Sequence, residues 1–254
     1  MSSPYRNSGI PYAIRRSDRA RRARIVVDRD GVEVVVPRRM PLREVAPFVA
    51  EKQEWIERTR RRYERAAEHG PVVDLCDGGS VPLLSRDLPL RVRVEPGRVR
   101  PHVALREDLL GEASVGDSAQ LELAPAAELH VAIGEPGRPA LRQALERWYR
   151  RRAHAEIAPR LDAATARAGT RYTRLTIRGQ RTRWASCSDS GAMSFNWRLL
   201  LAPEPVLDYV VEHEVAHLDV MGHSRRFWAL VERRCPDYRE HERWLRRYGS
   251  TLHL

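Results

Sequence analysis

Residues 210–228, VVEHEVAHLDVMGHSRRFW, concentrate side chains that can bind a metal ion and move a proton. His213 and His217 are four residues apart, and Glu214 directly follows the first histidine. Residues four apart lie on one face of a helix, so the two imidazoles can bind one metal ion. From its position, Glu214 can accept a proton from a water that the metal activates and pass it to a leaving group. The spacing predicts a metal-dependent hydrolytic site.

A catalytic zinc ion typically takes three protein ligands and leaves a fourth position to water. The best third ligand is His223, ten residues after His213 and directly after Gly222. We expect Gly222 to end the helix in a left-handed conformation, and Ser224 to cap the helix that follows. The sequence therefore predicts one Zn²⁺ ion bound by His213, His217 and His223.

Two other arrangements of zinc peptidases compete with this one. The metzincin pattern HExxHxxGxxH also ends in a histidine at this spacing, but Val220 occupies its glycine position and no methionine follows Met221. In gluzincins the third ligand is a glutamate on a later helix, for which Glu232 is the candidate. His223 ranks above Glu232 because it is nearer and because histidine is the commoner zinc ligand.

The metal ligands must be held in place by the secondary structure around them, and the sequence predicts a helix and a sheet there. From about Pro205, apolar residues recur at spacings of three and four through the motif, which indicates a helix. A longer helical pattern runs from Pro139 to Gly169, and three β-like runs follow it: YTRLTIR, TRWASC and AMSFNWRLLL. We expect residues 138–250 to form a zincin-like catalytic domain, with a small antiparallel sheet packed on the HExxH helix.

The N-terminal half has a different pattern. Residues 1–10 are expected to form a flexible tail, and RARIVV and VEVVV a β-hairpin about Asp28 to Gly31. Apolar spacing from about Leu42 to Gly70 predicts one long helix, and residues 71–137 contain short alternating runs that favour strands. Residues 11–137 are therefore predicted as a β-rich region with one long helix, and the fold class as α+β.

The charge of the chain indicates a nucleic acid as a further candidate partner. Its 254 residues contain 45 Lys plus Arg and 34 Asp plus Glu, a formal net charge of +11. Arginines cluster at 19–24, 58–62, 150–152 and 243–247, and basic surfaces bind polyanions. Lys52 is the only lysine, so a codon bias toward arginine is an alternative cause of the excess.

Compartment and oxidation state follow from weaker signals. No apolar run is long enough to cross a bilayer and the N-terminus has no apolar signal core, so we expect a cytoplasmic protein with no membrane partner. The three cysteines are odd in number and form no CxxC pair, which favours reduced thiols. The sequence does not predict the oligomeric state.

Two adjoining segments carry a family resemblance. RTRWASCSDSGAMSFNWRLLLAP, followed by LDYVVEHEVAHLDVMGHSRRFWALVERRCPDY, resembles the YgjP-like metal-dependent hydrolases, relatives of the SprT-like and WLM zinc proteases. The resemblance implies that His213, His217 and His223 bind zinc and that Glu214 is the catalytic acid/base. Ala185 departs from the glycine that the family usually has in W-G-S-C, and residues 71–137 match only loosely.

The resemblance also suggests how a substrate binds. If AMSFNWRLLL is a strand that borders the cleft, an extended peptide can pair with its edge, with Met193, Phe195, Trp197 and Leu199 facing one side. An ordinary core strand is an equal alternative. Trp184, Asn196 and Trp197 are the substrate-binding candidates, and no residue is assigned to oxyanion stabilisation.

Three functions are compared on this basis. The leading one is a zinc metallopeptidase that cleaves a peptide or protein substrate, with Glu214 as general base. A second keeps the zinc but hydrolyses a non-peptide substrate such as a nucleotide phosphoanhydride. The third is a DNA-associated, SprT-like protease or binding module.

Overall fold

A computed structural model of the chain describes residues 5–7, 10–28, 31–107, 127–180 and 183–254. The chain divides into two compact units, Met1–Gly70 and Pro71–Leu254. The sequence placed the division after residue 137 instead. The strands between Pro71 and that point share one hydrophobic core with the later helices, and the boundary therefore lies at Gly70.

The first unit contains a four-stranded sheet in the order β1-β2-β4-β3. Its strands are β1 (Tyr5–Asn7), β2 (Ile10–Ser17), β3 (Arg24–Asp28) and β4 (Gly31–Pro37). The predicted hairpin is confirmed, since β3 and β4 pair antiparallel with Asp28 opposite Gly31. Asp30, which precedes Gly31 in the predicted turn, lies outside the described residues. Part of the predicted tail, Tyr5–Asn7, is a strand paired with β2.

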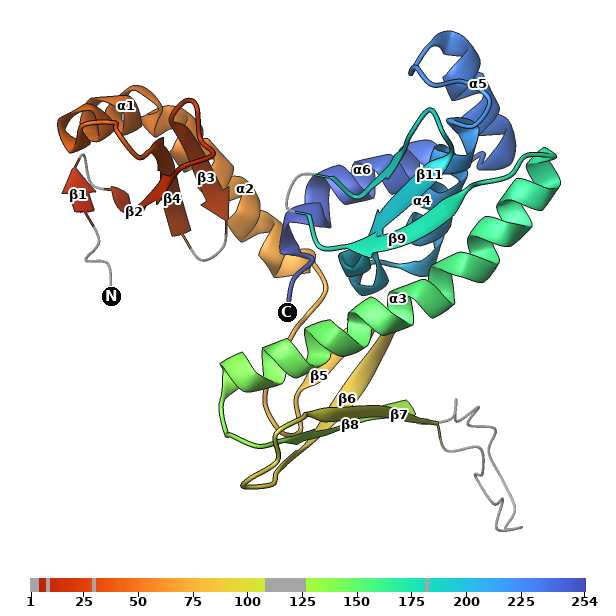
Figure 1. Cartoon of the computed structure of the whole chain (residues 1–254), viewed down its shortest axis with the longest axis horizontal. Helices are drawn as coiled ribbons and strands as arrows, with labels where there is room; N and C mark the ends of the chain where they lie inside the picture. Colours follow the sequence, from red (N-terminus) through yellow and green to blue (C-terminus); the bar gives the residue numbers. More distant parts are fainter. Residues whose placement is uncertain (1–4, 8–9, 29–30, 108–126, 181–182) are drawn as a thin grey trace. The chain divides into compact units, whose positions relative to one another are not determined.

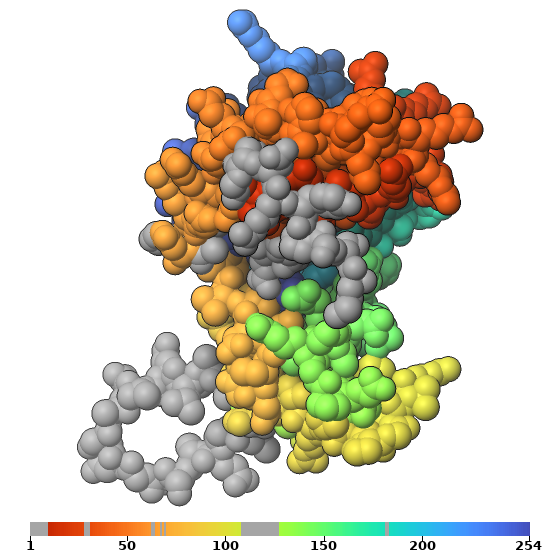
Figure 2. Space-filling view, turned by 90° about the vertical axis from the view of Figure 1, so that its left-hand side faces the viewer, coloured from red at the N-terminus to blue at the C-terminus, as the bar shows by residue number. Residues whose placement is uncertain are grey.

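Two helices follow this sheet, where the sequence predicted one. They are α1 (Val45–Glu51) and α2 (Gln53–His69), after a short 3-10 turn η1 (Leu42–Glu44). The break falls at Lys52, whose backbone (φ −101°, ψ 9°) departs from helical values. Val45, Val49 and Ile56 pack into the core of the sheet. Most described side chains of α2 remain exposed, as its orange atoms in Figure 2 illustrate.

The second unit contains two sheets on either side of one long helix, α3 (Arg138–Ala168), as Figure 1 shows. The first sheet has the order β5-β6-β8-β7. Its strands are β5 (Ser80–Leu83), β6 (Arg86–Val94), β7 (His102–Glu107) and β8 (Ala127–Ile133). These strands confirm the β-rich prediction for this region.

Helix α3 supplies the core of this unit. Leu145, Tyr149 and Ile157 are fully buried, and the Tyr149 hydroxyl donates a 2.5 Å hydrogen bond to the Pro82 carbonyl at the first sheet. The helix ends where the sequence predicted, because Gly169 adopts the left-handed conformation (φ 66°) that a helix C-terminus favours.

The second sheet of this unit has the order β10-β11-β9. Its strands are β9 (Arg174–Arg178), β10 (Ala185–Cys187) and β11 (Ala192–Asn196). β11 pairs antiparallel with β10 but parallel with β9, so the sheet is mixed and the predicted antiparallel arrangement is wrong in part. β11 also ends at Asn196, and the residues after it form the 3-10 helix η2 (Trp197–Leu201).

Three helices complete the chain: α4 (Glu204–Ala216), α5 (Arg225–Arg234) and α6 (Tyr238–Tyr248), followed by the short turn η3 (Gly249–Thr251). Helix α4 carries the HExxH motif, lies against α3, and contacts β10. Within the described residues, no helix is both long and apolar enough to span a membrane.

Candidate metal centre

Three imidazoles converge at the end of α4. The ligand nitrogens of His213, His217 and His223 all lie within 4.8 Å of one another, and the Nε2 atoms of His213 and His223 are 3.2 Å apart. Among the described residues, this is the group of His, Cys, Asp and Glu side chains that can hold a metal ion. Neither Cys187 nor Glu232 belongs to it; Glu232 instead pairs with Arg239 at 3.6 Å.

The local backbone explains this convergence. Helix α4 ends at Ala216, but His217 keeps helical angles (φ −68°, ψ −20°), so the four-residue spacing to His213 still aligns the two rings. Gly222 has no positive φ, contrary to the expectation, because the helix ends six residues before it. The Ser224 hydroxyl accepts the Phe227 amide at 3.4 Å, which begins α5 directly after His223.

Phe227 is a contact that the sequence did not assign to the site. Its ring is fully buried, and its centroid lies 4.5–4.9 Å from the centroids of all three imidazoles. One aromatic ring therefore packs against every candidate ligand and fixes the rings relative to one another. The HSRRFW pattern predicted the helix that carries Phe227, while this packing is a tertiary contact.

Two of the three histidines, His213 and His217, are held in the neutral form that binds metals. Burial, followed by repulsion from His217 and His223, lowers the pKa of His213 to about 3. Burial also lowers the pKa of His217. The Nδ1 atom of His217 lies 3.2 Å from the Val220 carbonyl oxygen, which can only accept, so Nδ1 carries the proton and Nε2 stays open to a metal.

Glu214 directly follows His213 on α4. It is 5% exposed, and burial raises its pKa to about 8, while a hydrogen bond from the Cys187 backbone acts in the opposite direction. Its Oε2 atom is buried and has no hydrogen-bond partner among the described residues. A buried carboxylate oxygen without a partner is costly, which is typical of a group kept for chemistry.

The edge strand β10 brings the Cys187 amide to Glu214. The Cys187 thiol has a pKa raised to about 11, mainly by burial, so it is a neutral thiol rather than a nucleophile. Tyr209, also on α4, packs near the first histidine, with its ring centroid 5.9 Å from that of His213.

The three substrate-binding candidates lie in different environments. The Asn196 amide donates to the carbonyl oxygens of Gln180 and Arg183, and its oxygen accepts the Arg198 amide at the start of η2. Trp197 is 1% exposed and packs on Tyr149. Both placements favour a structural role. Trp184 is half-buried, and a side chain at Gly249 would come within 2.7 Å of its ring.

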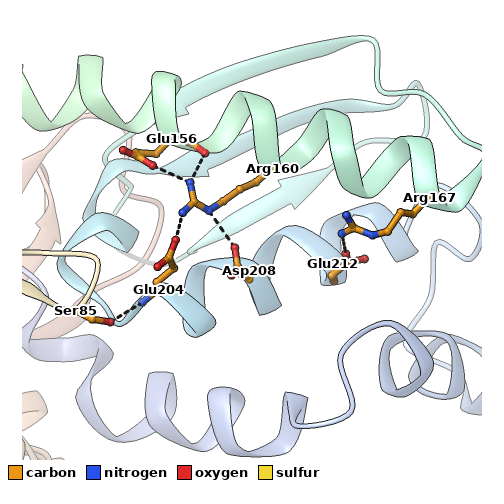
Figure 3. Close-up of polar contacts among 7 residues, drawn as sticks. All are labelled: Ser85, Glu156, Arg160, Arg167, Glu204, Asp208 and Glu212. Atoms are coloured by element: carbon orange, nitrogen blue, oxygen red, sulfur yellow. Dashed lines mark hydrogen bonds and ion pairs between the residues drawn. The ribbon is translucent and has the colours of Figure 1, made fainter.

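Three carboxylates of α4, those of Glu204, Asp208 and Glu212, all pair with arginines of α3, as Figure 3 shows. Arg160 of α3 donates to Glu156 at 2.7 Å, to Asp208 at 3.0 Å and to Glu204. Arg167 of α3 pairs with Glu212 at 2.6 Å. The Arg160–Glu156 pair lies within α3, whereas the other three pairs join α3 to α4 and hold the HExxH helix against α3.

Taken together, the donor set suits a divalent metal. Three converging imidazoles, with the buried Glu214 directly after the first of them in the chain, form the site of a metal-dependent hydrolase.

Comparison with known proteins agrees with this class. Residues 21–248 match the YgjP-like metallopeptidase domain, and the chain belongs to that family. The crystal structure of the metallopeptidase zymogen of Pyrococcus abyssi abylysin is similar at 25% identity, over 37% of this chain and 95% of that chain, with a TM-score of 0.34. The chain matches no curated protein.

Proposed function

We propose that this protein is a zinc peptidase in which His213, His217 and His223 bind one ion and Glu214 acts as general base. The observation that carries the proposal is the convergence of three ligand nitrogens within 4.8 Å. The buried carboxyl group of Glu214 directly follows one of these ligands in the chain. Membership of a metallopeptidase family supports a peptide or protein substrate.

Zinc fits this donor set better than a harder cation. Imidazole nitrogens suit Zn²⁺, whereas Mg²⁺ and Ca²⁺ prefer oxygen ligands. When bound, the ion would supply Lewis-acid chemistry, polarising a carbonyl group and lowering the pKa of a water. The contact between His217 Nδ1 and the Val220 carbonyl orients one ligand, as partners of metal-binding histidines commonly do.

Glu214 moves the proton in this mechanism. Its carboxylate takes a proton from the attacking water and delivers it to the amine that leaves when the peptide bond breaks. Burial raises the pKa of this group to about 8 in the metal-free protein, and a bound cation would favour the carboxylate form that accepts the proton. The Cys187 amide hydrogen bond fixes the direction in which the carboxylate faces.

We further propose that an extended substrate pairs with β10 rather than with β11. β11 has a strand on each side, so it offers no free edge, whereas β10 is the edge strand and contacts α4. A peptide added there would gain backbone hydrogen bonds beside the metal centre. The three free cysteines are consistent with a reducing compartment, and a cytoplasmic location remains part of the proposal.

The test combines metal content with substrate choice. We expect one zinc per chain by atomic emission, and loss of zinc in His213→Ala and His223→Ala but not in the control His241→Ala. Casein and peptide-library digestion should be detected, and nucleotide hydrolysis should not. Unchanged zinc in both triad variants would refute the metal site. Nucleotide hydrolysis without peptide cleavage would refute the peptidase.

A further inference from the structure

The positive charge of the chain is concentrated in the first unit. Residues 1–70 contain 17 basic and 10 acidic side chains, so this unit carries +7 of the +11 net charge. An arginine-rich composition alone would spread the excess along all 254 residues. The distribution therefore needs a local explanation.

Much of this charge gathers at one end of the sheet. Ser17 pairs with Pro37 in the parallel β2–β4 ladder, and Arg24 begins the neighbouring strand β3. The loops 18–23 and 38–41 therefore emerge side by side. The Arg16 guanidinium donates to the Arg38 carbonyl and joins the two segments. We call this surface the arginine-rich end: Arg16, Arg19, Arg21, Arg22, Arg24, Arg38 and Arg39.

These arginines are exposed and little neutralised. All seven are exposed, and the two segments 16–24 and 37–41 contain one acidic residue, Asp18, which pairs with Arg38 at 3.3 Å. No carboxylate among the described residues pairs with Arg19, Arg21, Arg22 or Arg39. In the second unit, by contrast, a single arginine, Arg160, pairs with three carboxylates.

We propose that the arginine-rich end binds double-stranded nucleic acid through its phosphates. Like charges held together on ordered loops repel one another, and polyanion binding relieves that repulsion with release of counterions. Guanidinium groups donate in a fork that matches phosphate oxygens. These segments expose no aromatic side chain on which unpaired bases could stack, so a duplex backbone fits better than a single strand.

An anionic membrane fits less well. Membrane-surface segments combine basic residues with several apolar ones that enter the lipid. Near the arginine-rich end, Leu42 is the exposed large hydrophobic residue among those described. The proposal does not rest on the metal centre or on hydrolytic activity.

The experiment measures binding of the full chain to fluorescent 20-base-pair DNA and RNA duplexes by anisotropy, from 50 to 300 mM NaCl. The variant R19Q/R21Q/R22Q/R39Q should bind at least about 10-fold more weakly at 100 mM salt, and its slope of log K against log salt should fall by about 3 to 4. The matched control R93Q/R100Q/R106Q/R233Q removes the same charge from exposed arginines of the second unit and should change affinity less than about 3-fold.

Circular dichroism would verify that both variants fold. Three outcomes would overturn the proposal: duplex binding that does not depend on salt, equal losses in the two quadruple variants, or binding to phosphatidylserine vesicles without duplex binding. Preference for the DNA or the RNA duplex would identify which nucleic acid the surface takes.

Discussion

The two polar faces of α4 differ in how their charges are satisfied. On the face toward α3, Glu204, Asp208 and Glu212 all pair with arginines. Glu214, which directly follows the ligand candidate His213, instead keeps one carboxylate oxygen without a hydrogen-bond partner among the described residues. One helix therefore separates polar groups that stabilise the fold from polar groups kept available for a ligand and a proton.

The largest expected effect is on peptidase activity, when one carboxylate on each face is replaced in turn by an amide. Glu214→Gln removes the proposed base while keeping the shape, so peptidase activity should fall by about 10²- to 10⁴-fold with zinc content unchanged. The matched control Glu212→Gln, two residues away and paired with Arg167, should keep activity within a few fold. Equal losses in the two variants would remove the functional distinction between the faces.

The pH dependence of the unfolding free energy should show whether Glu214 is perturbed by burial. Glu214 has an ordinary pKa of 4.5 that rises to about 8 in the folded protein, so between these values the folded state binds more protons than the unfolded state. In metal-free protein, the unfolding free energy of the wild type minus that of Glu214→Gln should therefore increase as pH falls. The increase should be about 2 kcal/mol from pH 8 to pH 6.

Urea titrations of both metal-free proteins at several pH values would measure this difference. Subtracting the variant cancels the histidines, whose lowered pKa values change stability in the opposite direction: the unfolded chain takes up their protons first on acidification. A difference that is constant with pH would show that burial does not perturb Glu214.

A smaller effect should follow from loosening the packing beneath the ligands. Phe227→Leu keeps an apolar side chain but loses the ring that contacts all three imidazoles, so zinc affinity should fall by about 10-fold. Phe195→Leu is a matched control, since Phe195 is 1% exposed in the core on β11. Competition with a zinc chelator measures affinity, and equal affinities in the two variants would reduce Phe227 to an ordinary core residue.

The smallest effect is expected on the paired face. Arg160→Gln leaves three carboxylates without their shared partner, but two of them, Glu204 and Asp208, are about half exposed and screened by water. We expect a loss of about 1 kcal/mol in unfolding free energy, with activity per folded molecule unchanged. Arg160→Lys keeps the positive charge but loses the forked guanidinium group, so its unfolding free energy should lie between those of the wild type and Arg160→Gln. Loss of activity without loss of stability would contradict the structural role.

The sequence predicted the candidate site better than its surroundings. The four-residue spacing of His213 and His217 is a local property of a helix, and it holds in the structure even though His217 lies just beyond the helix end. The position of Phe227 beneath three rings is set by how α5 folds back on α4. No pattern within HSRRFW encodes that contact.

The fold shows the same limit. β-forming residues after Asn196 suggested a continuing strand, but the Asn196 side chain caps a 3-10 helix there, and tertiary packing decides the outcome. The division of the chain at Gly70 was also not predicted. Leu88 and Leu129 of the first sheet share a core with Leu145 of α3, and that pairing depends on contacts between distant segments.

Helix α3 has a consequence for how the catalytic unit comes apart. With 31 residues, it spans about 46 Å at 1.5 Å per residue, and it packs against the sheets on both sides. Detaching either sheet would expose the apolar surface that α3 buries against it, and residues of both sheets belong to one continuous core with the helix. The unit should therefore melt in a single calorimetric transition, with the slowest amide hydrogen exchange near Tyr149.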